Sequence, residues 1–222
     1  MHANSTCLAW DTVKYLKLTP ACTRHWAFKY VGHNGQLHHA EVDVAQRRIA
    51  ADLNSGLPPT HLGAVRELFD LVLCNQVFEH VKDPHAAART LQSMVAPGGL
   101  VFWTAPFVEI EHPAAPKATI DGSDFFRYTC AGARQLFTSK GFLVLSEQRI
   151  GDTAVATGWL QGLGDADFGG YSSPKLRKQL VHVKPDCGRP HSHQFNCSKH
   201  SQLMERMYIS CALVLQKAPE PR

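Results

Sequence analysis

The chain has 222 residues, of which 44% are hydrophobic and 19% are charged. This length and composition fit one medium-sized globular domain and exclude a collagen-like or low-complexity chain. The formal net charge of +4 comes without a run of five or more Lys or Arg residues, so no nucleic-acid or membrane-surface patch is indicated.

The first 29 residues are weakly patterned, so we expect a poorly defined segment over 1–29 and a single domain over 30–222. No stretch approaches the roughly 20 apolar residues of a membrane helix. No basic region followed by an apolar one marks a secretory leader at the start. The seven cysteines are scattered without a Cys-x-x-Cys pair, which favours a reducing compartment and hence a cytoplasmic protein.

Two short strands are predicted at 42–44 and 49–53, followed by a turn at Gly56-Leu57-Pro58-Pro59. The compact apolar run Phe69–Cys74 indicates a buried parallel strand. A helix is expected after Asp83-Pro84, because Asp is a good N-cap and Pro fits the first helical position. One face of this helix carries apolar side chains at helical spacing: Ala87, Ala88, Leu91, Met94 and Val95.

Pro97-Gly98-Gly99 is expected to end that helix, and Leu100–Ala105 to form a second buried strand. Thr129 can cap a further helix that ends at Gly141, before a strand over Phe142–Glu147. A loop-rich insert follows around 151–207, and Tyr208–Gln216 is predicted as a last strand, antiparallel at or near the sheet edge. Alternating strands and helices predict an α/β fold: a mostly parallel, Rossmann-like sheet flanked by helices.

The most specific stretch of sequence runs from Phe69 to Val81 and continues through Asp83-Pro84 and Ala96-Pro97-Gly98-Gly99. Together with the flanking motifs it resembles the class I S-adenosylmethionine-dependent methyltransferases of the type 11 subgroup. The flanking motifs are Ala51-Asp52-Leu53 with Leu57-Pro58, Thr104-Ala105-Pro106-Phe107, His112-Pro113, Asp124, Phe126-Arg127-Tyr128-Thr129, Leu136-Phe137 and Gly141-Phe142.

The resemblance implies S-adenosylmethionine as cofactor and a small-molecule methyl acceptor, with neither nucleic acid nor membrane as partner. Asp52 would accept a hydrogen bond from the adenine amino group, with the Leu53 amide beside it. The turn at Asn75 and Gln76 would line the methionine end, because ligands of open parallel sheets lie beyond the carboxyl ends of the strands. Glu79 would lie beside the cofactor or a small acceptor.

His80 is the candidate catalytic base, since an imidazole can take the proton of an O–H or N–H acceptor near neutral pH. Its alternative is a structural role. The residues after the Leu100–Ala105 strand would build the lid over the acceptor: His112, Asp124, Arg127 and Tyr128. Arg127 can pair with Asp124 or bind an anionic substrate, and an anchoring role for this group is the alternative.

The sequence departs from the family at its first cofactor element, because no Asp/Glu-x-Gly-x-Gly-x-Gly turn is present. The ribose-binding acid is ambiguous: one alignment places Asn34 there, with no carboxylate, and the other Asp43. A second hypothesis is therefore a truncated or catalytically impaired protein of the same fold that acts as a binding or structural module.

A cysteine–histidine cluster lies within the loop-rich insert: Cys187, His191, His193, Cys197 and His200. Thiolate and imidazole are zinc ligands, which makes a zinc-dependent module a third hypothesis. The spacing matches no standard finger or ribbon, so we assign no metal site from the sequence. The oligomeric state is not predicted.

Overall fold

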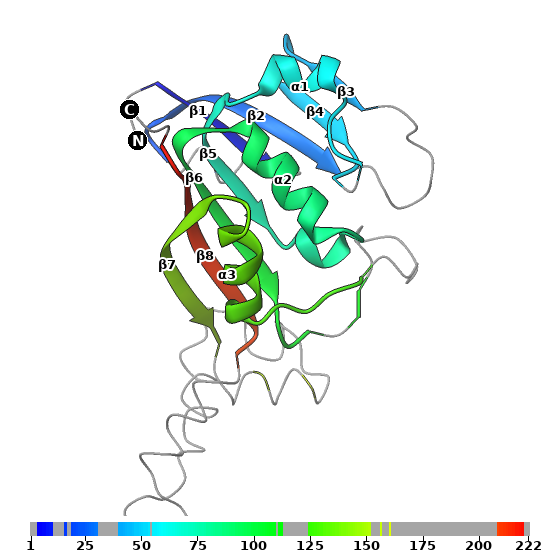
Figure 1. The fold of residues 1–222 in the computed structure, drawn as a ribbon, viewed down its shortest axis with the longest axis vertical. Coiled ribbons are helices and arrows are strands. Elements are labelled where there is room, and N and C mark those ends of the chain that lie inside the picture. Colours follow the sequence, from blue (N-terminus) through cyan, green and yellow to red (C-terminus); the bar gives the residue numbers. More distant parts are fainter. Residues whose placement is uncertain are drawn as a thin grey trace, which may run out of the picture.

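The described residues of the chain form one eight-stranded sheet in the computed structural model of Figure 1. The model describes residues 4–10, 16, 19–30, 40–53, 55–109, 111–112, 124–151, 156, 160 and 208–219. The strand order is β3-β4-β2-β1-β5-β6-β8-β7. In chain order the strands are β1 (Ser5–Trp10), β2 (Cys22–Tyr30), β3 (Glu41–Asp43), β4 (Arg48–Ala51), β5 (Phe69–Asn75), β6 (Val95–Pro106), β7 (Phe142–Ile150) and β8 (Ser210–Lys217).

The five strands from β4 to β6 are mutually parallel, while β3 and β8 run antiparallel to their neighbours. The predicted α/β sheet is thus confirmed, including the antiparallel strand near the C-terminus next to edge strand β7. Strand β2 lies on one side of β1 in the sheet, whereas β5 lies on the other side. This reversal creates a switch point at the carboxyl ends of β1 and β5, where open α/β sheets bind ligands.

The expectation for residues 1–29 is wrong, because this segment contributes the central strand β1 and the full-length strand β2. All six residues of β1 are buried between β2 and β5. A six-residue run with mixed small and polar side chains gives little periodicity, and burial on both faces removes the alternation that marks a strand. The connection from β1 to β2 spans residues 11–21 and contains no glycine.

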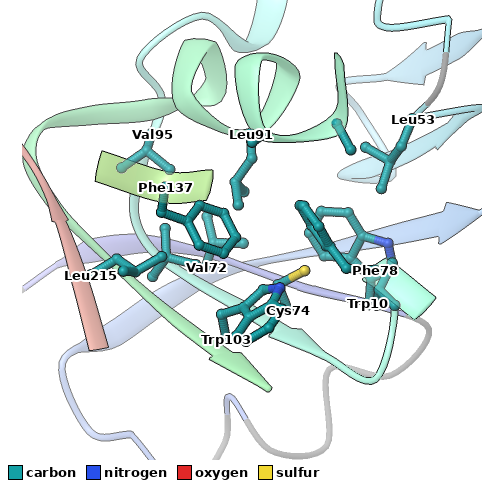
Figure 2. Packing of buried hydrophobic residues seen from close by; sticks show 14 of the residues in the cluster. Trp10, Leu53, Val72, Cys74, Phe78, Leu91, Val95, Trp103, Phe137 and Leu215 are labelled. Atoms are coloured by element: carbon teal, nitrogen blue, oxygen red, sulfur yellow. The ribbon is translucent and has the colours of Figure 1, made fainter. Parts of the chain in front are cut away.

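Alternate side chains of the central strands enter two different clusters, because successive strand residues point to opposite faces. Val72 and Cys74 belong to the large cluster beneath the helices, whereas Leu71 packs with Cys7 and Ala9 on the other face. Figure 2 shows the large cluster, where Phe78, Trp103 and Phe137 meet with ring centroids 5.3–5.9 Å apart. This cluster ties the turn after β5 to both main helices.

Helices α2 (Pro84–Met94) and α3 (Cys130–Thr138) cover the same face of the sheet (Figure 1). Both predicted N-caps are confirmed: the Asp83 carboxylate accepts from the Ala86 amide at 2.9 Å, and Thr129 Oγ1 accepts from Gly132 at 3.1 Å. The turn predicted at Pro58-Pro59 instead opens a short helix, α1 (Pro59–Val65). Proline fits the first helical turn, where its missing N–H costs nothing.

Four of the described cysteines are paired in disulfides, which corrects the expectation of scattered thiols drawn from their spacing, while Cys74 is a buried free thiol. Cys7 pairs with Cys22 between β1 and β2, and Cys130 at the start of α3 pairs with Cys211 in β8. Both pairs join strands or helices that are adjacent only after folding, a relation that spacing alone does not reveal. No helix among the described residues is long and apolar enough to cross a bilayer. The cluster Cys187–His200 lies outside the described residues.

Candidate functional site at the carboxyl edge of the sheet

Polar side chains gather where the parallel strands end. Asp52 follows β4 directly, and its carboxylate accepts a hydrogen bond from Ser55 Oγ at 3.2 Å. Asn75 is the last residue of β5, and its Oδ1 is buried without a hydrogen-bond partner among the described residues. Three strand spacings separate β4 from β5, or about 14 Å. Polar groups thus mark two points of this edge that are about 14 Å apart.

The turn after β5 is held by the neighbouring strand β6. Gln76 has a left-handed backbone with φ of 51°, and its amide donates to the Thr104 carbonyl at 2.9 Å. Its side-chain amide donates to Thr104 Oγ1 at 3.1 Å. Leu53 is fully buried in the core, so only its backbone is available beside Asp52. These contacts fix the positions of the polar groups at this edge.

Asp43 does not join this group. It pairs with Arg48 at the start of β4, whereas Asp52 follows the other end of the same strand. Residues 41–51 form a tight hairpin of β3 and β4, and the Asp43 carboxylate accepts from the Gln46 amide within it at 2.8 Å. We therefore assign Asp43 no cofactor role. Asn34, the other alignment, lies outside the described residues.

A short 3-10 turn, η2 (Phe78–His80), places Glu79 and His80 above the ends of β5 and β6. Glu79 is fully buried, and neither carboxylate oxygen has a hydrogen-bond partner among the described residues. His80 Nε2 lies 3.9 Å from Glu79 Oε1. Burial raises the pKa of Glu79 to about 8; the negative charge of Asp124 also raises it, while Arg127 lowers it.

The segment after β6 brings His112 onto the same spot. Its ring lies edge-on to His80 with centroids 5.0 Å apart, and the ligand atoms of Glu79, His80 and His112 all lie within 4.8 Å of one another. The sequence placed these residues in separate motifs, and their meeting was not predicted. The meeting could have been expected only from the order of the strands, because His112 follows β6 and Glu79 and His80 follow its neighbour β5.

Asp124 and Arg127 pair with each other, one of the two options that the sequence left open. Arg127 donates to the two Asp124 oxygens at 2.5 and 2.6 Å, and the His112 amide donates to Asp124 Oδ2 at 3.0 Å. Burial tends to raise the pKa of Asp124, but the hydrogen bonds from Arg127 and His112 outweigh it and lower this pKa. The pair fastens the segment around residue 124 over the site.

Tyr128 is an anchor rather than an open acceptor contact. Its side chain is buried, its hydroxyl donates to the Phe78 carbonyl at 3.1 Å, and its ring meets Trp103 at 5.4 Å. Burial raises the pKa of Tyr128. Tyr208, for which the sequence predicted no role at the site, is also an anchor: its hydroxyl accepts a hydrogen bond from the Cys130 amide at the start of α3 at 2.8 Å. The backbone amides of Phe125 and Phe126 also bond the Glu79 carbonyl, at 2.7 and 3.2 Å.

A central parallel sheet with this strand order, a switch point between β1 and β5 and polar groups at the carboxyl edge define the class I S-adenosylmethionine-dependent methyltransferase fold. The methyltransferase domain model of the family Methyltransf_23 matches residues 13–150, and the chain belongs to this family.

Curated relatives match over a shorter region. The ubiquinone biosynthesis O-methyltransferase of Pseudomonas entomophila is 41% identical over 71 residues, which are 31% of this chain and 28% of that protein. The corresponding enzyme of Pseudomonas syringae pv. tomato is 42% identical over 72 residues, with the same shares. The chain thus aligns with less than a third of the length of these relatives.

Solved structures share the fold at low identity. An S-adenosylmethionine-dependent methyltransferase from Mesorhizobium loti has a TM-score of 0.51 at 10% identity, over 97% of this chain and 93% of that one. Phosphoethanolamine N-methyltransferase 2 from Haemonchus contortus, in complex with S-adenosyl-L-methionine, has a TM-score of 0.51 at 11% identity, over 99% of this chain and 50% of that one.

Proposed function

We propose that this protein binds S-adenosylmethionine at the carboxyl edge of β4, β1 and β5 and transfers its methyl group to an oxygen of a small-molecule acceptor. Family membership supports the donor. The match to O-methyltransferases supports oxygen as the receiving atom. The observation that carries the proposal is the buried, unpartnered Asn75 Oδ1 at the switch point, because a buried acceptor without a partner is costly unless a ligand donor meets it.

The residues of this edge fit the donor's chemistry. Asp52 offers a carboxylate at the end of β4 to an amino group, and Asn75 offers its amide oxygen to the ammonium of an amino-acid tail. When bound, S-adenosylmethionine supplies a methyl on a sulfonium sulfur: the S–C bond breaks as the O–C bond forms, and a neutral thioether leaves. The chain's part is to align the acceptor and to receive its proton.

The proton of the acceptor hydroxyl would pass to the group formed by Glu79, His80 and His112. His80 is nearly buried, while the His112 side chain is 33% exposed, so His112 is the member that an acceptor meets first. We retain His80 as the proposed base and extend the role to the pair of rings, which are in edge contact. Asp124, Arg127 and Tyr128 would hold the lid in place.

The test is methyl transfer from labelled S-adenosylmethionine to a panel of phenols and catechols by the full chain. Asp52→Asn and its matched control Asp43→Asn are measured beside the wild type. Asn keeps an acceptor oxygen but loses the charge, and hydrogen bonds to charged groups exceed neutral ones by about 1 kcal/mol, so KM for the donor should rise about fivefold in Asp52→Asn. Asp43→Asn should leave it unchanged. Equal effects of the two variants would contradict the assignment of this edge.

A second candidate is the binding or structural module without methyl transfer. The observation in its favour is the connection after β1, where the family carries its glycine-rich turn. This chain has eleven residues there, 11–21, and none is glycine. Close approach of backbone to a cofactor favours glycine. A chain that folds normally but neither binds nor turns over the donor would establish this alternative.

A further inference from the structure

We propose that Glu79, His80 and His112 form a binding site for a divalent first-row transition metal ion, with Asp124 orienting His112 from behind. Two imidazoles and one carboxylate are a ligand set that zinc, iron and cobalt accept, whereas magnesium and calcium prefer oxygen ligands alone. No metal site was assigned to these residues from the sequence.

The first argument is the state of Glu79. Its side chain is fully buried, and neither oxygen accepts a hydrogen bond from a described residue. The nearby cation Arg127 is already engaged by both oxygens of Asp124. A buried carboxyl group without a hydrogen-bond partner is costly to ionise, and a bound cation offsets that cost. A cation between Glu79 and the two rings resolves this.

The second argument is geometric. The three ligand atoms lie within 4.8 Å of one another, and the Glu79–His80 pair is at 3.9 Å. Ligands of a tetrahedral zinc ion are about 3.3 Å apart, given metal–ligand distances of about 2.0–2.2 Å. Side-chain rotations that move each atom by about 1 Å would therefore complete the site. The backbone of Glu79 is held by hydrogen bonds from the Phe125 and Phe126 amides to its carbonyl, and that of His112 by the bond from its amide to Asp124.

The third argument is the support around His112. Its Nδ1 lies 3.4 Å from Asp124 Oδ2, and its backbone amide donates to the same oxygen. Metal-binding histidines commonly donate their second ring nitrogen to a carboxylate, which fixes the ring and its tautomer. With Nδ1 turned to Asp124, the metal-binding nitrogen of His112 would be Nε2. The Arg127 pairing keeps Asp124 in this outer position and out of the ligand set.

Three protein ligands leave further coordination positions open on the side where His112 is exposed. This consequence rests on the proposed function: an acceptor oxygen that reaches the ion would lose its proton more readily, because a bound cation lowers the pKa of a hydroxyl. With the ion bound, the two rings would act as ligands in place of the base role given to them above, and the acceptor proton would pass to solvent on the exposed side of His112. The metal site itself stands or falls independently of the donor.

The experiment uses the full chain, stripped with a chelator and dialysed, in the absence of S-adenosylmethionine and of any acceptor. Zinc binding is measured by calorimetry and by metal content after dialysis, and cobalt binding by absorption. The variants are Glu79→Gln and His112→Asn, with His85→Asn as the control: His85 is an exposed histidine in the first turn of α2. Circular dichroism checks that each variant is folded.

We expect Glu79→Gln and His112→Asn each to weaken zinc binding at this site at least about tenfold and to retain one fewer equivalent than His85→Asn. The part of the cobalt absorption spectrum that is present in the wild type and absent from these two variants should consist of ligand-field bands without a thiolate charge-transfer band. Wild-type metal content in both variants would overturn the proposal. So would cobalt binding that carries only thiolate charge transfer, which would assign the metal to cysteines elsewhere. Metal binding by a chain that does not bind the donor would contradict the proposed function but not the metal site.

Discussion

The pair formed by Asp124 and Arg127 offers a quantitative test of how the acceptor-side segment is held. The Asp124 side chain is 1% exposed, while that of Arg127 is 26% exposed. Arg127 also donates to the carbonyls of Glu109 at 3.3 Å and Phe126 at 2.9 Å. Removing one partner of a buried pair leaves the other charge uncompensated, so the exposure of the survivor decides the cost.

Arg127→Met should therefore cost more than Asp124→Ala. The former leaves a carboxylate almost without water and bonded to the His112 amide, which places its cost at about 3–5 kcal/mol. The latter leaves a guanidinium that is one-quarter exposed and keeps two carbonyl acceptors, so about 2 kcal/mol is expected after allowance for solvent. The double variant removes both charges, and its cost should fall short of the sum by about 2 kcal/mol.

The assay is urea unfolding of the wild type and the three variants, followed by circular dichroism and tryptophan fluorescence. Coincident transitions and a constant dependence on urea are required for the comparison. Costs that add within about 0.5 kcal/mol would show that the two side chains do not interact. A larger loss in Asp124→Ala than in Arg127→Met would refute the reasoning from exposure.

Three further predictions concern the framework beneath the site. Gly99→Ala should destabilise the protein by about 1–3 kcal/mol, because a Cβ at Gly99 would lie 2.8 Å from the Ala96 carbonyl oxygen. Gly98→Ala should cost about 1 kcal/mol, because Gly98 has open space around it but a φ of 75°. Urea unfolding that ranks the two variants in reverse would contradict this. Cys130→Ser should cost more than Cys7→Ser, about 4.5 against about 3 kcal/mol, because the bridges close loops of 81 and 15 residues; thermal unfolding under oxidising conditions gives the order. Asp83→Ala should cost about 1 kcal/mol through the lost N-cap of α2, and an unchanged urea midpoint would show that the cap contributes nothing.

The stretch from β5 to β6 was predictable because its signals are local. An apolar run, an Asp-Pro helix start and an apolar helix face each act within a few residues, and the structure has β5 and α2 where they predict them. The helix end was predicted too late, because α2 stops at Met94 and β6 already begins at Val95, so Pro97-Gly98-Gly99 lies within the strand. Local signals also predict α3, whose cap and buried face lie within one helix.

The parts that escaped prediction depend on contacts between distant segments. Strand β1 is recognisable as a strand only by its neighbours β2 and β5, and the disulfide partner of Cys130 lies 81 residues away. Asp43, one of two alternatives for the ribose-binding acid, lies in the β3–β4 hairpin at the other end of β4 from Asp52, an arrangement that the linear sequence does not contain. The meeting of Glu79 with His112 follows from the adjacency of β5 and β6, which a linear reading does not contain.

The central claim is that the carboxyl edge of this sheet binds the methyl donor although the first connection has no glycine. Calorimetric titration of the full chain with S-adenosylhomocysteine tests it without the need for an acceptor. We predict saturable binding at a single site, weakened about fivefold in Asp52→Asn and unchanged in Asp43→Asn. No binding of either the donor or its demethylated product at millimolar concentration, by a chain that unfolds cooperatively, would contradict the account.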